Sequence, residues 1–428
     1  MLISAKKIKL SYEEAIYLAI LFMTFYTAPL FSFCPVRFSD IGGLILLYIG
    51  YKASQLIQYT SYNILYLILA IWIIIDFCII PLIFPLFSFT NHITQSIRLE
   101  LAILTFLYIP NIFRVCSFES ILRIIKKVIL THAWIQIIYV ILYFLHIRFC
   151  FNLIENFDER LALISGNGHF FNHFIIVNVS EGSPRFSGLF EEPAWFGWNM
   201  NLMLGFVLQS SLIYPYKSTI LTYKNWIVIL LSFIFTFSIS AIGSLGIIIF
   251  TYSIQKYKHH IGKLLILFIG LTSSIVLYII LNPSILARLL LISEGGDGST
   301  SSRIIGSWNA LITTLHTFPI TGYGLGDFNS TQFFTYAKEN TLLQGIKIGN
   351  IHLMEIHNLI CQIICNLGII GGILLLQPFM RLIKPSTIII GISFLLMFFS
   401  VNVYNTFFFF TMASFTFYFF LSKYKFNL

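Results

Sequence analysis

Long apolar runs alternate with short polar segments along almost the whole chain. The runs are continuous, without the residue-by-residue alternation of a membrane β-barrel, and a helix needs about 20 apolar residues to cross a bilayer. They lie near residues 15–33, 41–51, 63–89, 99–113, 128–147, 194–214, 226–239, 241–255, 264–281, 357–377, 387–402 and 405–421. The pattern predicts an all-α polytopic membrane protein with about 12 transmembrane helices.

Two of these runs leave the count open. The run at 41–51 is short for a full crossing, and residues 226–255 could form one long bent helix instead of two short ones. The small residues between Ser238 and Gly243 permit either a kink or close helix packing. The prediction of twelve helices therefore has ten and eleven as its alternatives.

The composition excludes a soluble protein. Of the 428 residues, 57% are hydrophobic and 10% are charged, and the mean hydropathy is +0.86. A soluble domain carries about 25% charged residues. The whole chain, residues 1–428, is therefore expected to form a single integral membrane domain.

The net charge of +9 reflects membrane topology and does not predict a nucleic-acid partner. If the N-terminus is cytoplasmic, the inside segments hold 17 of the 26 Lys and Arg residues and the outside segments hold nine. Cytoplasmic loops carry such an excess, so both termini are expected on the cytoplasmic side. The first apolar run is too long for a signal peptide and lacks a small-residue cleavage site, which predicts an uncleaved first helix.

Two long polar segments, 148–193 and 282–355, interrupt the apolar pattern, and the topology places both outside the cytoplasm. Loops longer than about 15 residues are usually functional or disordered, and the aromatic residues and glycine turns here argue against disorder. Within the predicted spans, only Asp76 is a deeply placed acid. A proton-driven transporter usually carries several such groups. The sequence therefore favours chemistry at the outer face.

The first polar segment ends in Pro184-Arg-Phe-Ser-Gly-Leu-Phe-Glu-Glu-Pro-Ala-Trp-Phe-Gly197, at the start of an apolar run. Pro193 suits a helix start, with Glu191 and Glu192 near the positive end of the helix dipole. These residues can form a simple interfacial cap. Alternatively, the Arg185 guanidinium binds a phosphate while one glutamate acts as a base or binds sugar hydroxyls.

The second polar segment contains Arg288, then Arg303 followed by apolar residues at helical spacing up to Pro319. This spacing predicts an amphipathic helix on the outer membrane surface, capped by Ser301 or Ser302 and carrying Arg303 in its first turn. The glycines Gly322 and Gly324 follow it in Thr-Gly-Tyr-Gly-Leu-Gly-Asp. They predict either an ordinary turn or backbone amides that face an anion.

A third stretch, Ile356-His-Asn-Leu-Ile-Cys-Gln-Ile-Ile-Cys-Asn-Leu-Gly-Ile-Ile-Gly-Gly372, begins at the outer end of an apolar run. His357 can be a solvated polar tip or a general base that works near neutral pH. Asn358 beside it is a candidate substrate-binding residue.

No metal or cofactor is predicted. The six cysteines are scattered over spans and opposite membrane edges, and Cys361 and Cys365 lie one helical turn apart, which suits packing. Nothing near them completes a four-ligand metal site.

Together, the stretches Arg185–Gly197, Arg303–Gly324 and His357–Gly372 resemble the O-antigen polymerase and O-antigen ligase superfamily of bacterial inner-membrane glycosyltransferases. The resemblance implies a polytopic fold with two large periplasmic loops that contain short amphipathic helices. It also implies that Arg185 and Arg303 bind the pyrophosphate of an undecaprenyl-pyrophosphate-linked glycan, and that His357 assists the acceptor.

The expected function is therefore O-antigen polymerisation on the periplasmic face of the inner membrane, without a nucleotide sugar. A ligase, which transfers glycan to lipid A core, is the alternative within the family. A flippase for lipid-linked oligosaccharide is the alternative from another class. Expected partners are undecaprenyl-pyrophosphate-linked oligosaccharide, membrane lipid and, as a further option, a chain-length regulator.

Overall fold

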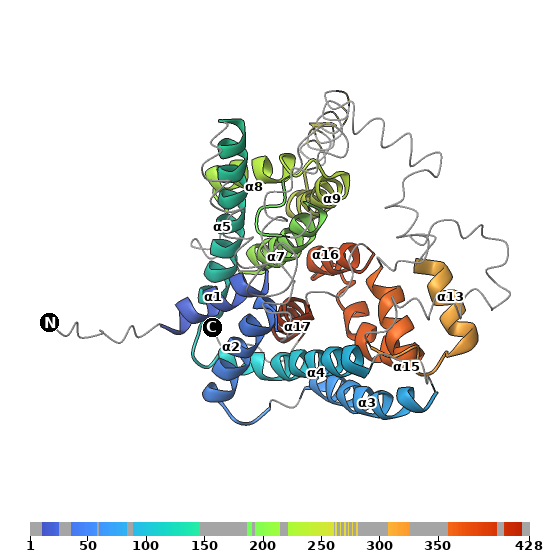
Figure 1. The fold of residues 1–428 in the computed structure, drawn as a ribbon. Coiled ribbons are helices and arrows are strands. Elements are labelled where there is room, and N and C mark those ends of the chain that lie inside the picture. Colours follow the sequence, from blue (N-terminus) through green and yellow to red (C-terminus); the bar gives the residue numbers. More distant parts are fainter. Residues whose placement is uncertain are drawn as a thin grey trace.

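The computed structural model describes residues 11–24, 36–57, 60–83, 89–145, 186–190, 193–214, 221–260, scattered positions of 262–280, 307–325, 358–399 and 406–421. Every regular element in these residues is helical, which confirms the all-α prediction (Figure 1). The helices are α1 (Tyr12–Met23), α2 (Phe38–Ala53), α3 (Ser61–Ile83), α4 (Phe89–Ile112), α5 (Phe118–Phe144), α7 (Pro193–Ile213), α8 (Tyr223–Ile234), α9 (Ile239–Tyr257), α13 (Ser307–Thr317), α15 (Leu359–Met380), α16 (Ile388–Phe398) and α17 (Thr406–Thr416), which continues into the π-helical turn η6 (Phe417–Leu421).

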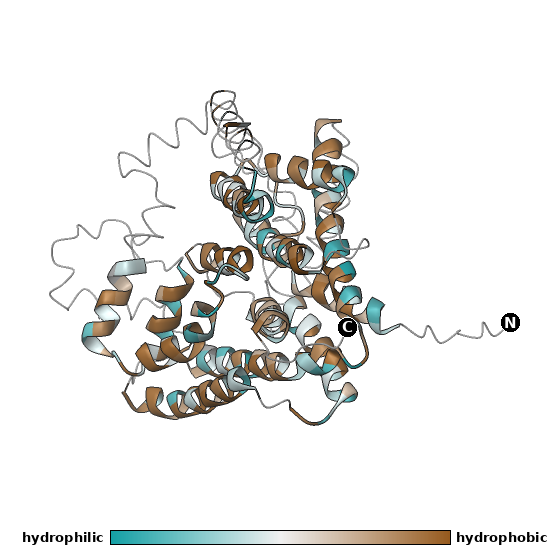
Figure 2. Cartoon of the chain, turned by 180° about the vertical axis from the view of Figure 1, so that it is seen from behind, coloured by the Kyte–Doolittle hydropathy of each residue, from teal (hydrophilic) through white to brown (hydrophobic). Residues whose placement is uncertain are grey.

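Four of the described helices, α3, α5, α9 and α15, are long and apolar enough to cross a membrane. Shorter apolar helices lie at α8, α16 and α17 with η6. Hydrophobic residues dominate the ribbon (Figure 2), and α3 leaves large apolar side chains exposed at helical spacing: Ile64, Ile68, Ile71, Ile75 and Leu82. Such a stripe is compatible with lipid and costly in water. The protein is a membrane protein, and the number of its crossings stays a prediction.

Some helices begin earlier than the predicted apolar runs, because a helix can extend beyond its apolar part. Helix α5 begins at Phe118, ten residues before the predicted run at 128, and the Ser117 side chain caps it by accepting from the Ser120 amide. Helix α4 likewise begins at Phe89. Hydropathy marks the part of a helix that suits lipid, whereas capping and backbone hydrogen bonds decide where the helix starts.

Helices α8 and α9 are separate, and the chain changes direction between them. Phe237 has a φ of 47° at the break between them. Helix α9 runs parallel to α7, because Gly197 packs on Ala241 and the Asn201 amide donates to the Ser244 hydroxyl at 2.6 Å. A single bent helix returning after α7 would run opposite to it. This register therefore favours the interpretation of 226–255 as two helices.

The part of α15 from Leu367 to Leu375 runs antiparallel to α3. The Tyr66 hydroxyl donates to the Leu375 carbonyl at 3.4 Å, and the Trp72 indole donates to the Leu367 carbonyl at 3.0 Å. Residue numbers thus rise along α3 while they fall along this part of α15. Helix α15 is broken at Gly368, so these contacts fix the direction of the part that follows the break.

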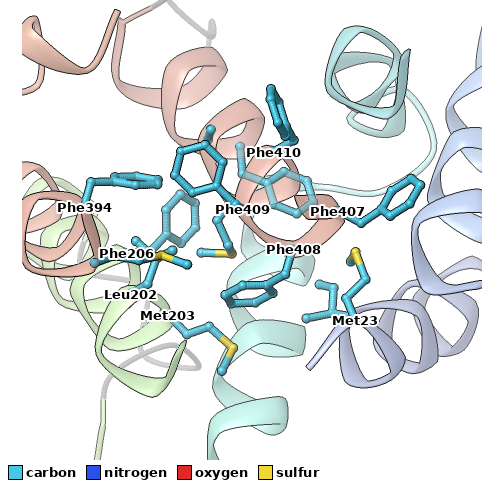
Figure 3. Close-up of a cluster of buried hydrophobic side chains, with 14 of the residues drawn as sticks. Met23, Leu202, Met203, Phe206, Phe394, Phe407, Phe408, Phe409 and Phe410 are labelled. Carbon is cyan, nitrogen blue, oxygen red and sulfur yellow. The ribbon is translucent and has the colours of Figure 1, made fainter. Parts of the chain in front are cut away.

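Helix α17 forms the centre of the bundle. All eleven of its residues are buried, including the four consecutive phenylalanines 407–410. These rings point in different directions around the helix and meet Met23, Phe206 and Phe394 from three other helices (Figure 3). A helix that is apolar on all sides is stable only when protein or lipid surrounds it completely. Packing at the centre therefore explains the Phe-rich sequence.

Two buried acids in the bundle have different surroundings. Asp40 of α2 forms a two-pronged ion pair with Arg98 of α4, at 3.0 and 3.2 Å. Asp76 of α3 is completely buried, and its carboxyl oxygens have no hydrogen-bond partner among the described residues. No described side chain therefore links Asp76 into a proton relay.

The topology is tested by placing single cysteines in the two long polar segments. In a background without native cysteines, Gly168→Cys and Gly298→Cys should both react with a membrane-impermeant maleimide in intact spheroplasts. The basis is the 17-to-9 split of basic residues between alternating loops. Protection of both cysteines until the cells are lysed would show that the topology is inverted.

Candidate functional site

Three of the predicted site residues lie in the described part of the chain: Gly322, Gly324 and Asn358. The other six lie outside the described residues: Arg185, Glu191, Glu192, Arg288, Arg303 and His357. The site can still be approached through the elements that adjoin these residues in sequence. Those elements are α13, the turn after it, the start of α15 and the segment 186–190 before α7.

Helix α13 confirms the predicted helix before Pro319, and it packs against α15. Its buried face carries small side chains one turn apart, Ser307, Ala310 and Thr314. Its opposite face exposes Trp308 and Ile312, together with Leu315. Small residues allow two helix backbones to approach closely, so the buried face is the one that suits contact with α15.

A glycine turn connects the end of α13 to the middle of α15. The amides of Tyr323 and Gly324 donate to the carbonyls of Cys365 and Asn366, at 2.7 and 3.0 Å, and the Ile369 amide donates to the Pro319 carbonyl at 2.8 Å. Helix α15 is interrupted at this point, where Gly368 has a φ of 65°. The break exposes backbone groups that the turn then satisfies.

The glycines are required here by both conformation and space. Gly322 and Gly324 have φ values of 69° and 85°, in the region that side chains rarely adopt. A Cβ on Gly322 would collide with the Cys365 carbonyl, and one on Gly368 would collide with the Ile320 carbonyl. We call Gly322, Gly324 and Gly368 the glycine joint. The Gly322 and Gly324 amides donate to the Phe318 and Asn366 carbonyls, so the structure explains the predicted turn, and any contact of these amides with an anion stays a prediction.

The glycine joint also contacts the first part of the bundle. A Cβ on Gly324 would meet Ile80 of α3 and lie 3.4 Å from the His92 ring of α4. The His92 Nδ1 atom lies 3.0 Å from the Leu325 carbonyl, and its ring stacks on Phe77. The joint is therefore fixed by α3 and α4 as well as by α15.

Helix α13 packs on α15 close to the break at Gly368. The Thr314 side chain of α13 interacts with that of Cys365, and the Pro319 carbonyl, two residues beyond α13, accepts from the Ile369 amide just after the break. Ser307 stands seven residues before Thr314, and Asn358 stands seven before Cys365. Seven residues correspond to about 10 Å of helix. Ser307 and Asn358 therefore each lie about 10 Å from the contact between Thr314 and Cys365.

Asn358 caps the start of α15. Its side-chain oxygen accepts from the amides of Ile360 and Cys361, at 3.0 and 3.3 Å, and the residue is buried. This contact satisfies amides that the helix leaves unpaired. Asn358 thus has a structural role, and its predicted contact with substrate remains to be tested.

The segment 186–190, which precedes α7, is held by α5 and by the break between α8 and α9. The Gln136 side chain donates to the Phe186 carbonyl at 2.8 Å, and the Phe186 amide donates to the Phe235 carbonyl at 3.4 Å. The His132 ring of α5 lies 4.8 Å from the Phe190 ring. Residues next to Arg185 and Glu191 in sequence are therefore anchored inside the protein.

Sequence reasoning did not single out His132 and Gln136. Both lie on α5 one turn apart, within the apolar run at 128–147. A pair of polar residues at this spacing on an apolar helix is the signal that could have identified them, because polar groups within membrane spans are usually functional or hydrogen-bonded. The segment that they contact could not be inferred from the sequence.

The described residues contain no group of three or more His, Cys, Asp or Glu side chains that could hold a metal ion. Cys361 and Cys365 are buried in α15, and Cys365 contacts α13 through Thr314. The contact agrees with the packing role expected from their spacing.

Comparison with protein families identifies the part of the chain that contains the glycine joint. Residues 226–376 match the family model described as O-Antigen ligase. The match supports the O-antigen polymerase and ligase superfamily. The matched region extends from α8 to near the end of α15 and includes both Arg303–Gly324 and His357–Gly372. No curated protein matches the chain.

Proposed function

We propose that the protein is an O-antigen polymerase. It joins oligosaccharide repeat units carried on undecaprenyl pyrophosphate, on the periplasmic face of the bacterial inner membrane, and both of its termini are cytoplasmic. The proposal is supported by the superfamily match and by the apolar helices.

The packing of α13 on α15 is the observation that carries the proposal. Arg303 precedes Ser307 by four residues, and His357 directly precedes Asn358. Four residues span at most about 14 Å. Because Ser307 and Asn358 each lie about 10 Å from the contact between Thr314 and Cys365, chain connectivity allows Arg303 and His357 to contact one lipid-linked oligosaccharide.

The electrostatics at the start of α15 suit a pyrophosphate. Helix N-termini carry a partial positive charge and favour bound phosphate, and α15 starts directly after His357 and Asn358. Guanidinium groups of Arg185, Arg303 and Arg288 would add full positive charges that hydrogen-bond to phosphate oxygens. These charges would stabilise the leaving group as it forms.

The proposed reaction transfers the growing glycan from its lipid to the next repeat unit. The bond between the anomeric carbon and the pyrophosphate oxygen breaks, and an acceptor sugar hydroxyl forms the new glycosidic bond. The hydroxyl proton passes to a base, for which His357 is the proposed residue and Glu191 or Glu192 the alternative. Undecaprenyl pyrophosphate leaves with the bonding electron pair.

Reconstitution tests this function directly. The protein in lipid nanodiscs, supplied only with lipid-pyrophosphate-linked repeat units, should extend the glycan and produce a ladder of chain lengths. Neither a nucleotide sugar nor a divalent metal should be required, so EDTA should leave the rate unchanged. Absence of any ladder with intact, folded protein would contradict polymerisation.

Ligation is the second candidate, because the matching family model is described as O-Antigen ligase. Adding lipid A core to the same nanodiscs separates the two activities. A ligase should transfer glycan only after core is added, whereas a polymerase should make the ladder without it.

A further inference from the structure

One row of side chains on α5 holds the segment between Arg185 and Pro193. Gln136 donates to the Phe186 carbonyl at 2.8 Å, and the Tyr143 ring meets the Phe186 ring edge-on at 5.4 Å. One turn before Gln136, the His132 ring packs on Phe190. The row therefore contacts both ends of the described segment, Phe186 and Phe190.

Both polar atoms of the Gln136 side-chain amide lie close to the segment. Its nitrogen is committed to Phe186, and its oxygen lies 3.0 Å from where a Cβ on Gly188 would stand. Gly188 also has a φ of 60°, which side chains rarely adopt. The backbone of the segment is thus shaped to one orientation of the Gln136 amide.

His132 is itself fixed, so it provides a rigid surface for Phe190. Its Nε2 atom lies 2.7 Å from the Thr24 hydroxyl of α1, and the residue is 1% exposed. On its other side, Phe190 packs edge-on against Phe196 of α7 at 5.5 Å. The residue that precedes Glu191 is therefore clamped between α5 and α7.

We propose that Gln136 and His132 are positioning residues for the proposed glycosyl transfer. They hold the backbone between Arg185 and Glu191, and so determine where the guanidinium meets the lipid pyrophosphate and where the carboxylate meets the acceptor sugar. The inference rests on the proposed function. Misplacing groups that act on the transition state lowers kcat more than it raises KM.

Gln136→Met tests this role, because methionine has a similar length and no amide donor. Ile138→Met is the matched control, since Ile138 lies on the same helix, is 49% exposed and places the same side chain toward lipid. We expect Gln136→Met to lower kcat about tenfold, because a small misplacement of a group that acts on the transition state costs about 10- to 100-fold in rate. The melting temperature should fall slightly, as expected from the loss of one buried hydrogen bond. KM and membrane level should change little, and Ile138→Met should match the parent.

A second measurement reports the segment itself, whatever the protein does. In a background without native cysteines, Ser187→Cys places a thiol at a position that is 2% exposed. A hydrophilic maleimide should label this thiol slowly in the parent and in Ile138→Met, and at least severalfold faster in Gln136→Met.

The outcomes separate the two hypotheses. Faster labelling together with a lower kcat supports the proposal. Unchanged labelling in Gln136→Met would overturn the positioning role, and faster labelling with unchanged kcat would overturn its link to the reaction. If the parent makes no glycan with any acceptor, the proposed function fails, while the labelling rate still decides whether Gln136 holds the segment.

Discussion

Arg185→Lys, Arg303→Lys and His357→Ala should each abolish long glycan chains in cells, while the protein still accumulates in the membrane. Lysine keeps the positive charge but loses the planar fork that bonds two phosphate oxygens at once. The loss should therefore be large at a pyrophosphate clamp. Lipopolysaccharide ladders on gels measure the length of the glycan chains, and immunoblots of membrane fractions measure the amount of protein in the membrane.

Arg123→Lys is the matched control. Arg123 lies 3.7 Å from Glu13 with half of its side chain exposed, and such surface pairs contribute about 0–1 kcal/mol. Its ladder should be normal. Normal ladders in all three site variants as well would refute the assignment of the active site.

The glycan product that remains in the three site variants shows whether the protein catalyses polymerisation, ligation or translocation. For a polymerase, lipid A core with a single repeat unit should remain, because translocation and ligation continue. For a ligase, long chains should stay on undecaprenyl pyrophosphate. For a flippase, single repeat units should be trapped on the cytoplasmic leaflet.

Gly368→Ala should separate α13 from α15 and remove most activity. A Cβ at this position would collide with the Ile320 carbonyl, and a φ of 65° is unfavourable for alanine. Strain of this kind costs about 1–3 kcal/mol, and overpacking adds about 1–3 kcal/mol. We expect glycan synthesis to fall at least tenfold, measured in nanodiscs per folded protein. Gly322→Ala, on the other side of the glycine joint, should lower glycan synthesis to a similar extent.

Gly243→Ala is the control for the glycine substitutions. Gly243 lies within α9, and a Cβ added there would meet no described atom of a neighbouring element within 4 Å. Alanine in a helix is about 1 kcal/mol more favourable than glycine, so stability should be unchanged or slightly higher. Full activity in Gly368→Ala would show that the relative position of α13 and α15 does not matter for the reaction.

The elements of the candidate site were predictable to different degrees. Apolar spacing after Arg303 and the stop at Pro319 predicted α13, and the described helix ends at Thr317. The pattern of the third stretch predicted a helix after Asn358, and α15 begins at Leu359. In contrast, Gly368 lies inside the apolar run at 357–377, where glycine is also typical of close helix packing, so the sequence pattern does not predict the break.

The sequence by itself determined that the chain is a helical membrane protein, because the length and composition of an apolar run decide whether it suits lipid. It also identified the short stretches on which the superfamily resemblance rests. Only the tertiary structure decided that α13 packs on α15, that Gly322 fits against Cys365, and that Gln136 holds Phe186. These contacts join residues far apart in the chain. They depend on how shapes and hydrogen-bonding groups match after folding, which no local pattern encodes.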